Sequence, residues 1–190
     1  MMNLKSVILL CIIISLAACG SDEPKKFEQA DKNFYPISSF IKAELQLVDS
    51  LPLAVFKYTN KDQKSDTQLI AKPDFRKIAE SFISPDITKE PLKKLYTESV
   101  FMDATINMVT FSYTTEDTTA EIRKIDVFIN PDTDKVKNIY VERISRGGDS
   151  TITQKMIWTT GKHFSVSTIL TKKDQPEQTL QEKYVWDMNQ

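Results

Sequence analysis

The second half of the chain repeats short runs of β-branched and aromatic residues, and this pattern constrains the fold most. The runs cover residues 106–113, 125–129, 136–144, 152–158, 164–170 and 180–186. Turn-forming sequences separate them, among them Asn130-Pro131-Asp132-Thr133-Asp134, Gly147-Gly148-Asp149 and Thr159-Thr160-Gly161-Lys162. Short strands joined by short turns pair most simply with their neighbours, so the pattern predicts an antiparallel meander.

The first half of the chain carries helical periodicity instead. Apolar residues three or four positions apart predict one helix over 36–49 and a second over 73–83. A weaker third helix is predicted over 87–95, with Asp86 as N-cap and Pro91 limiting its length. Residues 53–58 are a candidate strand, and residues 60–67 are predicted to be a polar loop.

These elements together predict an α+β fold. N-terminal helices are followed by an antiparallel meander sheet of about six or seven strands, and one face of that sheet packs against the helices. A chain of 190 residues, 41% of them hydrophobic, is long enough for one such domain with its own core.

Composition excludes several classes of function. The 25 basic and 26 acidic residues leave a net charge of -1, so we expect no nucleic acid among the partners. Four glycines leave little material for phosphate-binding loops. One histidine and two cysteines argue against the usual zinc and haem motifs, so we expect no metal and no cofactor.

The N-terminus has the layout of a secretory signal. Lys5 supplies a positive charge, and the ten residues 7–16 are apolar or small. That run matches a signal-peptide core and is too short to span roughly 30 Å of hydrocarbon. Ala17, Ala18 and Cys19 follow it directly.

Leu16-Ala17-Ala18-Cys19 resembles the lipobox of bacterial lipoproteins. The resemblance implies cleavage between Ala18 and Cys19 and attachment of acyl chains such as palmitate to Cys19. A diacylated or triacylated cysteine would hold the protein on a membrane without a transmembrane helix. The alternatives are an ordinary secretory signal, with Cys19 there by chance, and an uncleaved anchor.

The domain organisation follows from that cleavage site. We expect a lipoprotein signal peptide over 1–18, a lipidated flexible tether over 19–33, and a single α+β domain over 34–190. Gly20 is not the Asp associated with inner-membrane retention, and Ser21-Asp22-Glu23 is similar to signals for the outer surface. These residues favour an outer-membrane location in the cell envelope, with a generic charged tether as the alternative.

Candidate catalytic and metal-binding residues each have a simpler explanation. His163 lies beside a predicted turn with no identifiable catalytic partner, and no Gly-x-Ser-x-Gly motif is present. Asn130, Asp132 and Asp134 have the spacing of half a calcium loop, but the residues that should complete it are absent, so a turn is the better interpretation. The acidic pairs Glu116-Asp117 and Asp22-Glu23 lie in polar segments and are expected to be solubilising charges. No catalytic residue is predicted.

Residues 127–136 also resemble the strand-turn-strand unit of PepSY-type envelope domains. That resemblance implies a binding or inhibitory module of the envelope, and it implies no functional residue.

The aromatic residues of the predicted strands are the remaining candidates for a ligand site, namely Trp158, Trp186, Tyr184, Phe164 and Tyr140. If they share the face away from the helices, they form a platform for a sugar, peptide or lipid. If they face the helices they are core, which is the favoured interpretation.

The leading hypothesis is therefore a lipid-anchored envelope protein that acts as a non-enzymatic binding or interaction module. Its expected partners are the membrane, through the acyl chains on Cys19, and an envelope protein, glycan or lipid. One alternative is a carrier or sensor of a lipid or other apolar ligand, which needs an apolar cavity of several hundred Å³. Another is a carboxylate-based enzyme, which needs buried acids close together.

Overall fold

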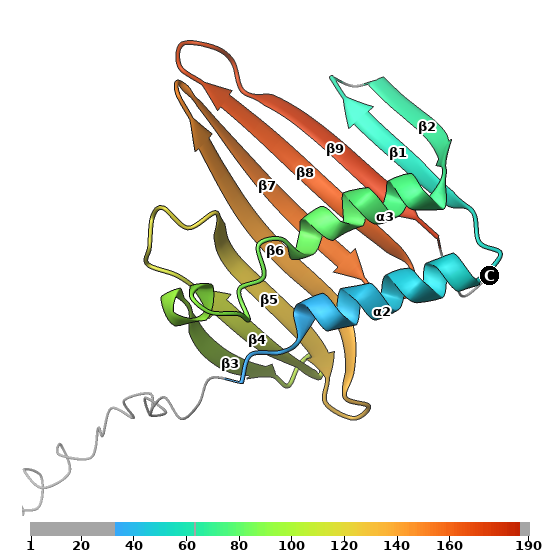
Figure 1. The fold of residues 1–190 in the computed structure, drawn as a ribbon, viewed down its shortest axis with the longest axis vertical. Coiled ribbons are helices and arrows are strands. Elements are labelled where there is room, and N and C mark those ends of the chain that lie inside the picture. The colour runs from blue at the N-terminus through green and yellow to red at the C-terminus, as the bar shows by residue number, and fades with distance from the viewer. Residues whose placement is uncertain (1–32, 63, 187–190) are drawn as a thin grey trace, which may run out of the picture. The chain divides into compact units, whose positions relative to one another are not determined.

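Within the described part of the chain, nine strands form one antiparallel sheet, and two α-helices lie across one of its faces (Figure 1). The computed structural model describes residues 33–62 and 64–186. The strand order is β2-β1-β9-β8-β7-β6-β5-β4-β3. The predicted signal peptide and all of the predicted tether except Asn33 lie outside the described residues, so these boundaries stay predictions.

The helices are α2 (Ile37–Ser50) and α3 (Lys72–Glu80), with the 3₁₀ turns η1 (Ser81–Ile83) and η2 (Leu92–Leu95). The strands are β1 (Val55–Lys61), β2 (Lys64–Ile70), β3 (Thr97–Asp103), β4 (Met108–Thr114), β5 (Ile122–Asn130), β6 (Lys135–Gly147), β7 (Ser150–Thr159), β8 (His163–Lys172) and β9 (Gln178–Val185).

The predicted fold class is wrong, because the protein is mostly one nine-stranded antiparallel sheet. Strands β1 and β2 form between the two helices, so helices do not simply precede a sheet of six or seven strands. β1 then pairs with β9, which places the first strand of the chain beside the last. The order of the sheet therefore departs from a plain meander at this junction.

The two strands that sequence analysis missed are both sheet edges. β2 was predicted as loop up to Thr67, and nearly all of its residues are exposed. β3 was not predicted, and it is also mostly exposed. An edge strand pairs on one side only and buries little, so its sequence need not carry the alternation that marks an inner strand.

The third predicted helix does not form over 87–95. The segment makes turns and ends in the short 3₁₀ turn η2. Asp86 still acts as a local cap, since its Oδ1 accepts hydrogen bonds from the Thr88 backbone N–H at 3.0 Å and hydroxyl at 2.7 Å. Pro91 lacks a backbone N–H, which limits any helix through this segment.

Six tight hairpin connections each contain a residue with positive φ, as closely turning strands require. The residues are Asp62, Asn107, Asp134, Gly148, Gly161 and Asp174. All are Asp, Asn or Gly, the types that tolerate the left-handed conformation best. The turn-forming residues in the second half of the sequence therefore predicted the last four of these connections, at Asp134, Gly148, Gly161 and Asp174, for a sound physical reason.

The core lies between the sheet and the helices, as expected. Strand pairing aligns one row of side chains through six strands, namely Tyr184, Phe164, Trp158, Ile139, Val127 and Phe111. A second row on the same face contains Val166, Met156, Val141, Ile125 and Tyr113. The buried face of α2 (Ile37, Ile41, Leu45 and Val48) and that of α3 with η1 (Phe75, Ala79 and Phe82) belong to the same cluster. We call this the helix-covered face and the opposite side of the sheet the open face.

Candidate functional site

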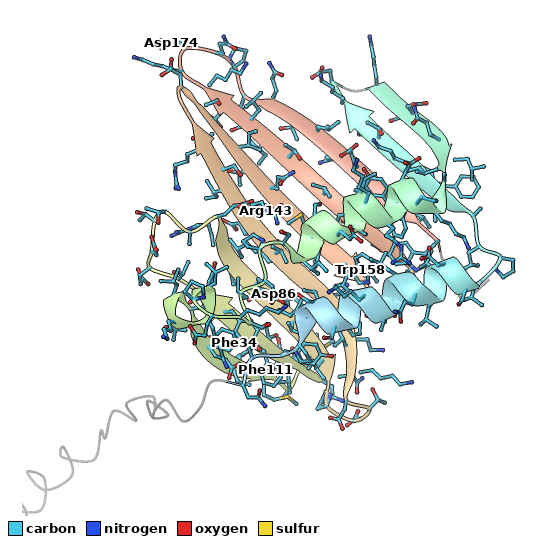
Figure 2. The ribbon with its side chains drawn as sticks, in the orientation of Figure 1. Phe34, Asp86, Phe111, Arg143, Trp158 and Asp174 are labelled. Atoms are coloured by element: carbon cyan, nitrogen blue, oxygen red, sulfur yellow. The ribbon has the colours of Figure 1, made fainter. Side chains whose placement is uncertain are left out.

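The four aromatic residues considered as a possible ligand platform are core residues, which was the favoured interpretation. Trp158 and Phe164 are fully buried, and Tyr184 and Trp186 are no more than 3% exposed. Phe75 of α3 contacts this group, with its ring centroid 5.1 Å from that of Trp186 (Figure 2 shows Trp158 beneath the two helices). The alternative of a ligand platform therefore does not hold for these four residues, because the alternation of each strand turns their rings toward the helices.

Tyr140, the fifth aromatic candidate, lies on the open face. Its register partner on β7 is Ile157, a partly exposed residue. The Tyr140 hydroxyl donates a 2.9 Å hydrogen bond to Glu142 Oε2. Burial, and then this hydrogen bond to a carboxylate, raise the pKa of Tyr140. Tyr140 is therefore a neutral, hydrogen-bonded residue on the open face, next to Ile157.

The other candidate residues occupy structural positions. His163 begins β8, and its Nε2 lies 3.2 Å from the Thr159 hydroxyl. Asn130 Oδ1 accepts the Asp132 backbone N–H at 2.9 Å, which confirms a turn. Asp117 Oδ1 accepts the Thr119 backbone N–H at 2.8 Å in the loop after β4. Across residues 33–62 and 64–186, no group of three or more His, Cys, Asp or Glu side chains could hold a metal ion.

A groove of about 440 Å³ lies on the open face over five strands, β2, β1, β9, β8 and β7. Strand pairing arranges its floor as two parallel rows of side chains. The first row runs Thr67, Tyr58, Lys183, Ser165 and Ile157. The second row runs Ser65, Asn60, Gln181, Ser167 and Lys155. The ten residues come from two parts of the chain, 58–67 and 155–183, and the pairing of β1 with β9 brings these parts together.

The groove offers hydrogen-bonding groups beside a small apolar surface. Four serine and threonine hydroxyls and two amides can each donate and accept, while two lysines only donate. Tyr58 is 45% exposed and Ile157 is 40% exposed, so the ring and the aliphatic side chain are both accessible. A polar floor with a few apolar contacts is typical of a site for a polar ligand rather than for an acyl chain.

The groove is cationic because the nearest acid of β9 points to the other face. Glu182 lies between Gln181 and Lys183, and it forms an ion pair with Lys57 on the helix-covered side. The hydrogen bond from Lys57 to Glu182 is the main reason that the pKa of Lys57 is raised. No ion pair joins Lys155 or Lys183 to an acid within the described residues, although Glu142 is the register partner of Lys155.

A second pocket, next to the helices, is far smaller than the groove. A depression between α2, η1 and β5, near Phe82 and Ile87, holds about 10 Å³, which is roughly the smallest volume that admits one water. Among the described residues, no helix is both long enough and apolar enough to span a bilayer.

Sequence analysis missed the groove because no local pattern marks it. Alternation along β1 and β9 does place Tyr58 with Asn60, and Gln181 with Lys183, on one face. The pairing of β1 with β9 joins these two couples, and it links strands that are more than 100 residues apart. Cys19 and Ala18, the predicted lipidation and cleavage residues, lie outside the described residues.

Comparison of the chain with protein-family models, with curated proteins and with solved structures found no match.

Proposed function

We propose that this chain is a lipid-anchored protein of the bacterial cell envelope and that its open-face groove binds an acidic glycan. It acts as a non-enzymatic binding module. The observation that carries the proposal is the arrangement of two lysines, four hydroxyls and two amides around the exposed ring of Tyr58. This arrangement lies on a sheet face that the helices leave uncovered (Figure 1).

The chemistry of the groove favours a sugar. Hydroxyl and amide side chains can both donate to and accept from sugar hydroxyls, and the face of a tyrosine ring can pack against the apolar face of a pyranose. Lys155 and Lys183 add charge-assisted hydrogen bonds to a carboxylate or sulfate group on the same ligand. A neutral sugar would leave both ammonium groups without an anionic partner.

The two competing hypotheses have less support. A carrier of an apolar ligand needs a large apolar cavity, whereas aromatic rings and aliphatic side chains pack the space between the sheet and the helices. A carboxylate-based enzyme needs two acids facing each other across a cleft. Two acids belong to the strands that line the groove, but alternation turns both side chains away from its floor. Glu182 pairs with Lys57, and Asp66 accepts a hydrogen bond from Gln68 of the same strand. We therefore do not propose either activity.

Lipidation at Cys19 is part of the proposal and is supported by the lipobox-like residues 16–19. Residues 20–33 would then connect the lipid to the domain, and a chain of this length spans at most about 50 Å. Such a tether would keep the groove close to the membrane of the envelope. Intact mass spectrometry of the protein purified from its own envelope should give residues 19–190 plus acyl chains. An unmodified chain that retains residues 1–18 would refute the anchoring.

Glycan binding is tested by titrating the purified protein with alginate as an acidic polysaccharide and dextran as a neutral one. Alginate should bind, and its affinity should fall with added salt because charged contacts contribute. Lys183→Ala should weaken alginate binding about tenfold or more, since each charge-assisted hydrogen bond contributes about 1.5–3 kcal/mol. Tyr58→Ala should also weaken it, by removing the stacking surface.

Lys173→Ala is the matched control, because it removes the same charge from the exposed β8–β9 turn outside the groove. This variant should bind alginate like the unmodified protein. Equal binding of dextran and alginate, or equal loss of binding in the Lys183 and Lys173 variants, would contradict the proposal. Urea unfolding of each variant separates a loss of binding from a loss of folding.

A further inference from the structure

The outer edge of β3 is an unpaired strand with an apolar centre. Among residues 33–62 and 64–186, β3 is the last strand of the sheet and pairs only with β4. Its three central residues are all well exposed, Val100 at 57%, Phe101 at 65% and Met102 at 47%. Such a strand presents free backbone N–H and C=O groups together with apolar side chains, which is the arrangement that pairs with another strand.

The opposite edge of the sheet lacks this apolar centre. β2 carries Lys64 and Asp66 within the strand, and its middle residues Ser65, Thr67 and Gln68 are polar and exposed. Charged and polar residues on an edge strand discourage pairing with other chains. In β3, the acids Glu98 and Asp103 stand near the two ends and leave residues 99–102 without charge. The two edges therefore have different exposed chemistry.

From this edge we infer that two copies of the chain form a dimer by antiparallel pairing of β3 with β3, about a two-fold axis through Phe101. In this register Phe101 faces Phe101 of the second copy, and Val100 faces Met102. Ser99 faces Asp103, so each apolar residue meets an apolar residue and each polar residue a polar one. The strand is thus complementary to itself, as a two-fold interface requires.

The charges and faces of the strand agree with this register. Val100 lies on the helix-covered face, in register with Phe111 of β4, whereas Phe101 lies on the open face, in register with Thr110. A two-fold axis perpendicular to the sheet keeps each face on its own side, so Glu98 and the Asp103 of the second copy lie on opposite faces. No two acids are placed directly opposite each other. The two sheets would join into one, and the paired backbones would satisfy the free groups of both edges.

A lipid bilayer is a less suitable partner for the β3 edge than a second copy of the chain. Lipid tails could cover the three apolar side chains, but they cannot accept or donate hydrogen bonds to an edge strand. A second β3 strand supplies both the apolar contacts and the hydrogen bonds. The second copy is therefore the partner that the observed edge favours.

The register is tested by cysteine cross-linking in the full chain, with Cys11 and Cys19 replaced by serine to remove background thiols. Phe101→Cys should form a disulfide-linked dimer on mild oxidation, because the two sulfurs meet at the axis and the Cα atoms of paired residues lie about 4.5–5.5 Å apart. Val100→Cys alone should cross-link much less, but a mixture of the Val100→Cys and Met102→Cys chains should cross-link with each other.

The dimer itself is measured by sedimentation velocity across a range of protein concentrations. The unmodified chain should shift from monomer to dimer as its concentration rises, and Phe101→Lys should remove that shift. Leu69→Lys is the matched control, since Leu69 is a comparably exposed residue on the other edge strand, at 69%. This control should dimerise like the unmodified chain.

Two outcomes would overturn the inference. One is a chain that stays monomeric at every concentration and does not cross-link through Phe101→Cys. The partner of the β3 edge would then be a strand of a different protein. The other is a dimer that Leu69→Lys disrupts as strongly as Phe101→Lys does. Circular dichroism of the lysine variants shows whether each is folded.

Discussion

Replacing Glu44 with leucine should lower the free energy of unfolding by about 2 kcal/mol. Glu44 lies on the buried side of α2 and is only 6% exposed. Its Oε2 accepts the Gly161 backbone N–H at 2.8 Å and lies 3.4 Å from the Trp158 indole nitrogen. One carboxylate therefore joins α2 to the turn between β7 and β8.

The magnitude follows from the two donors that leucine would leave without an acceptor. A buried donor without a partner costs about 1–3 kcal/mol, so we assign about 2 kcal/mol to Gly161 and about 1 kcal/mol to the longer Trp158 bond. Burial of the apolar leucine side chain stabilises the folded state by about 1 kcal/mol, so the net loss is about 2 kcal/mol. Glu44→Gln keeps a neutral acceptor and should cost about 1 kcal/mol or less.

Urea unfolding followed by tryptophan fluorescence measures these differences, because Trp158 and Trp186 are both buried beside the helices. The leucine variant should also melt about 4–8 °C lower. Glu80→Leu on the exposed end of α3 is the control and should change stability by less than about 0.5 kcal/mol. The reasoning would be refuted by a Glu44→Leu variant as stable as the unmodified protein. It would also be refuted by a Glu44→Gln variant whose unfolding free energy falls as much as that of the leucine variant.

Two further substitutions test the core and a buried tyrosine. Phe75→Ala should cost about 3–5 kcal/mol in urea unfolding, because Phe75 is fully buried against Trp158 and Trp186; a loss below about 1 kcal/mol would contradict this packing. Tyr96→Phe should cost about 1 kcal/mol at pH 7, because the Tyr96 hydroxyl donates a 2.8 Å bond to the Ile122 carbonyl. Burial raises the pKa of Tyr96 from 10.0 to about 12, so the folded state holds this proton more tightly than the unfolded state. The advantage of the tyrosine over phenylalanine is thus fully present below pH 10 and should shrink as the pH rises toward 12; a constant difference in unfolding free energy over that range would argue against it.

The sequence alone predicted the inner strands and the first two helices well. Six runs from residue 106 onward correspond to β4–β9, and residues 53–58 overlap β1. The predicted helices 36–49 and 73–83 match α2 and the pair α3 and η1. These elements were visible because helical and strand periodicity, like the preference of Asp, Asn and Gly for turns, are properties of neighbouring residues.

The edge strands could be identified only from the tertiary structure, and so could the face of each strand that meets the helices. β2 and β3 each pair on one side and bury little, so neither shows the apolar alternation of an inner strand. Trp158 and Tyr140 both looked like candidate ligand residues, yet they lie on opposite faces, with Trp158 facing the helices and Tyr140 on the open face. Alternation shows which residues of one strand share a face, but it does not show which face meets the helices.

The sequence by itself determined the local elements, the turns between them and the lipobox-like residues at the N-terminus. The tertiary structure decided that β1 lies beside β9, and this single pairing brings Tyr58 and Asn60 next to Lys183 and Gln181. The difference has a physical cause. Local preferences act over a few residues, whereas the partner of a strand depends on which distant segment completes its hydrogen bonds and buries its apolar face.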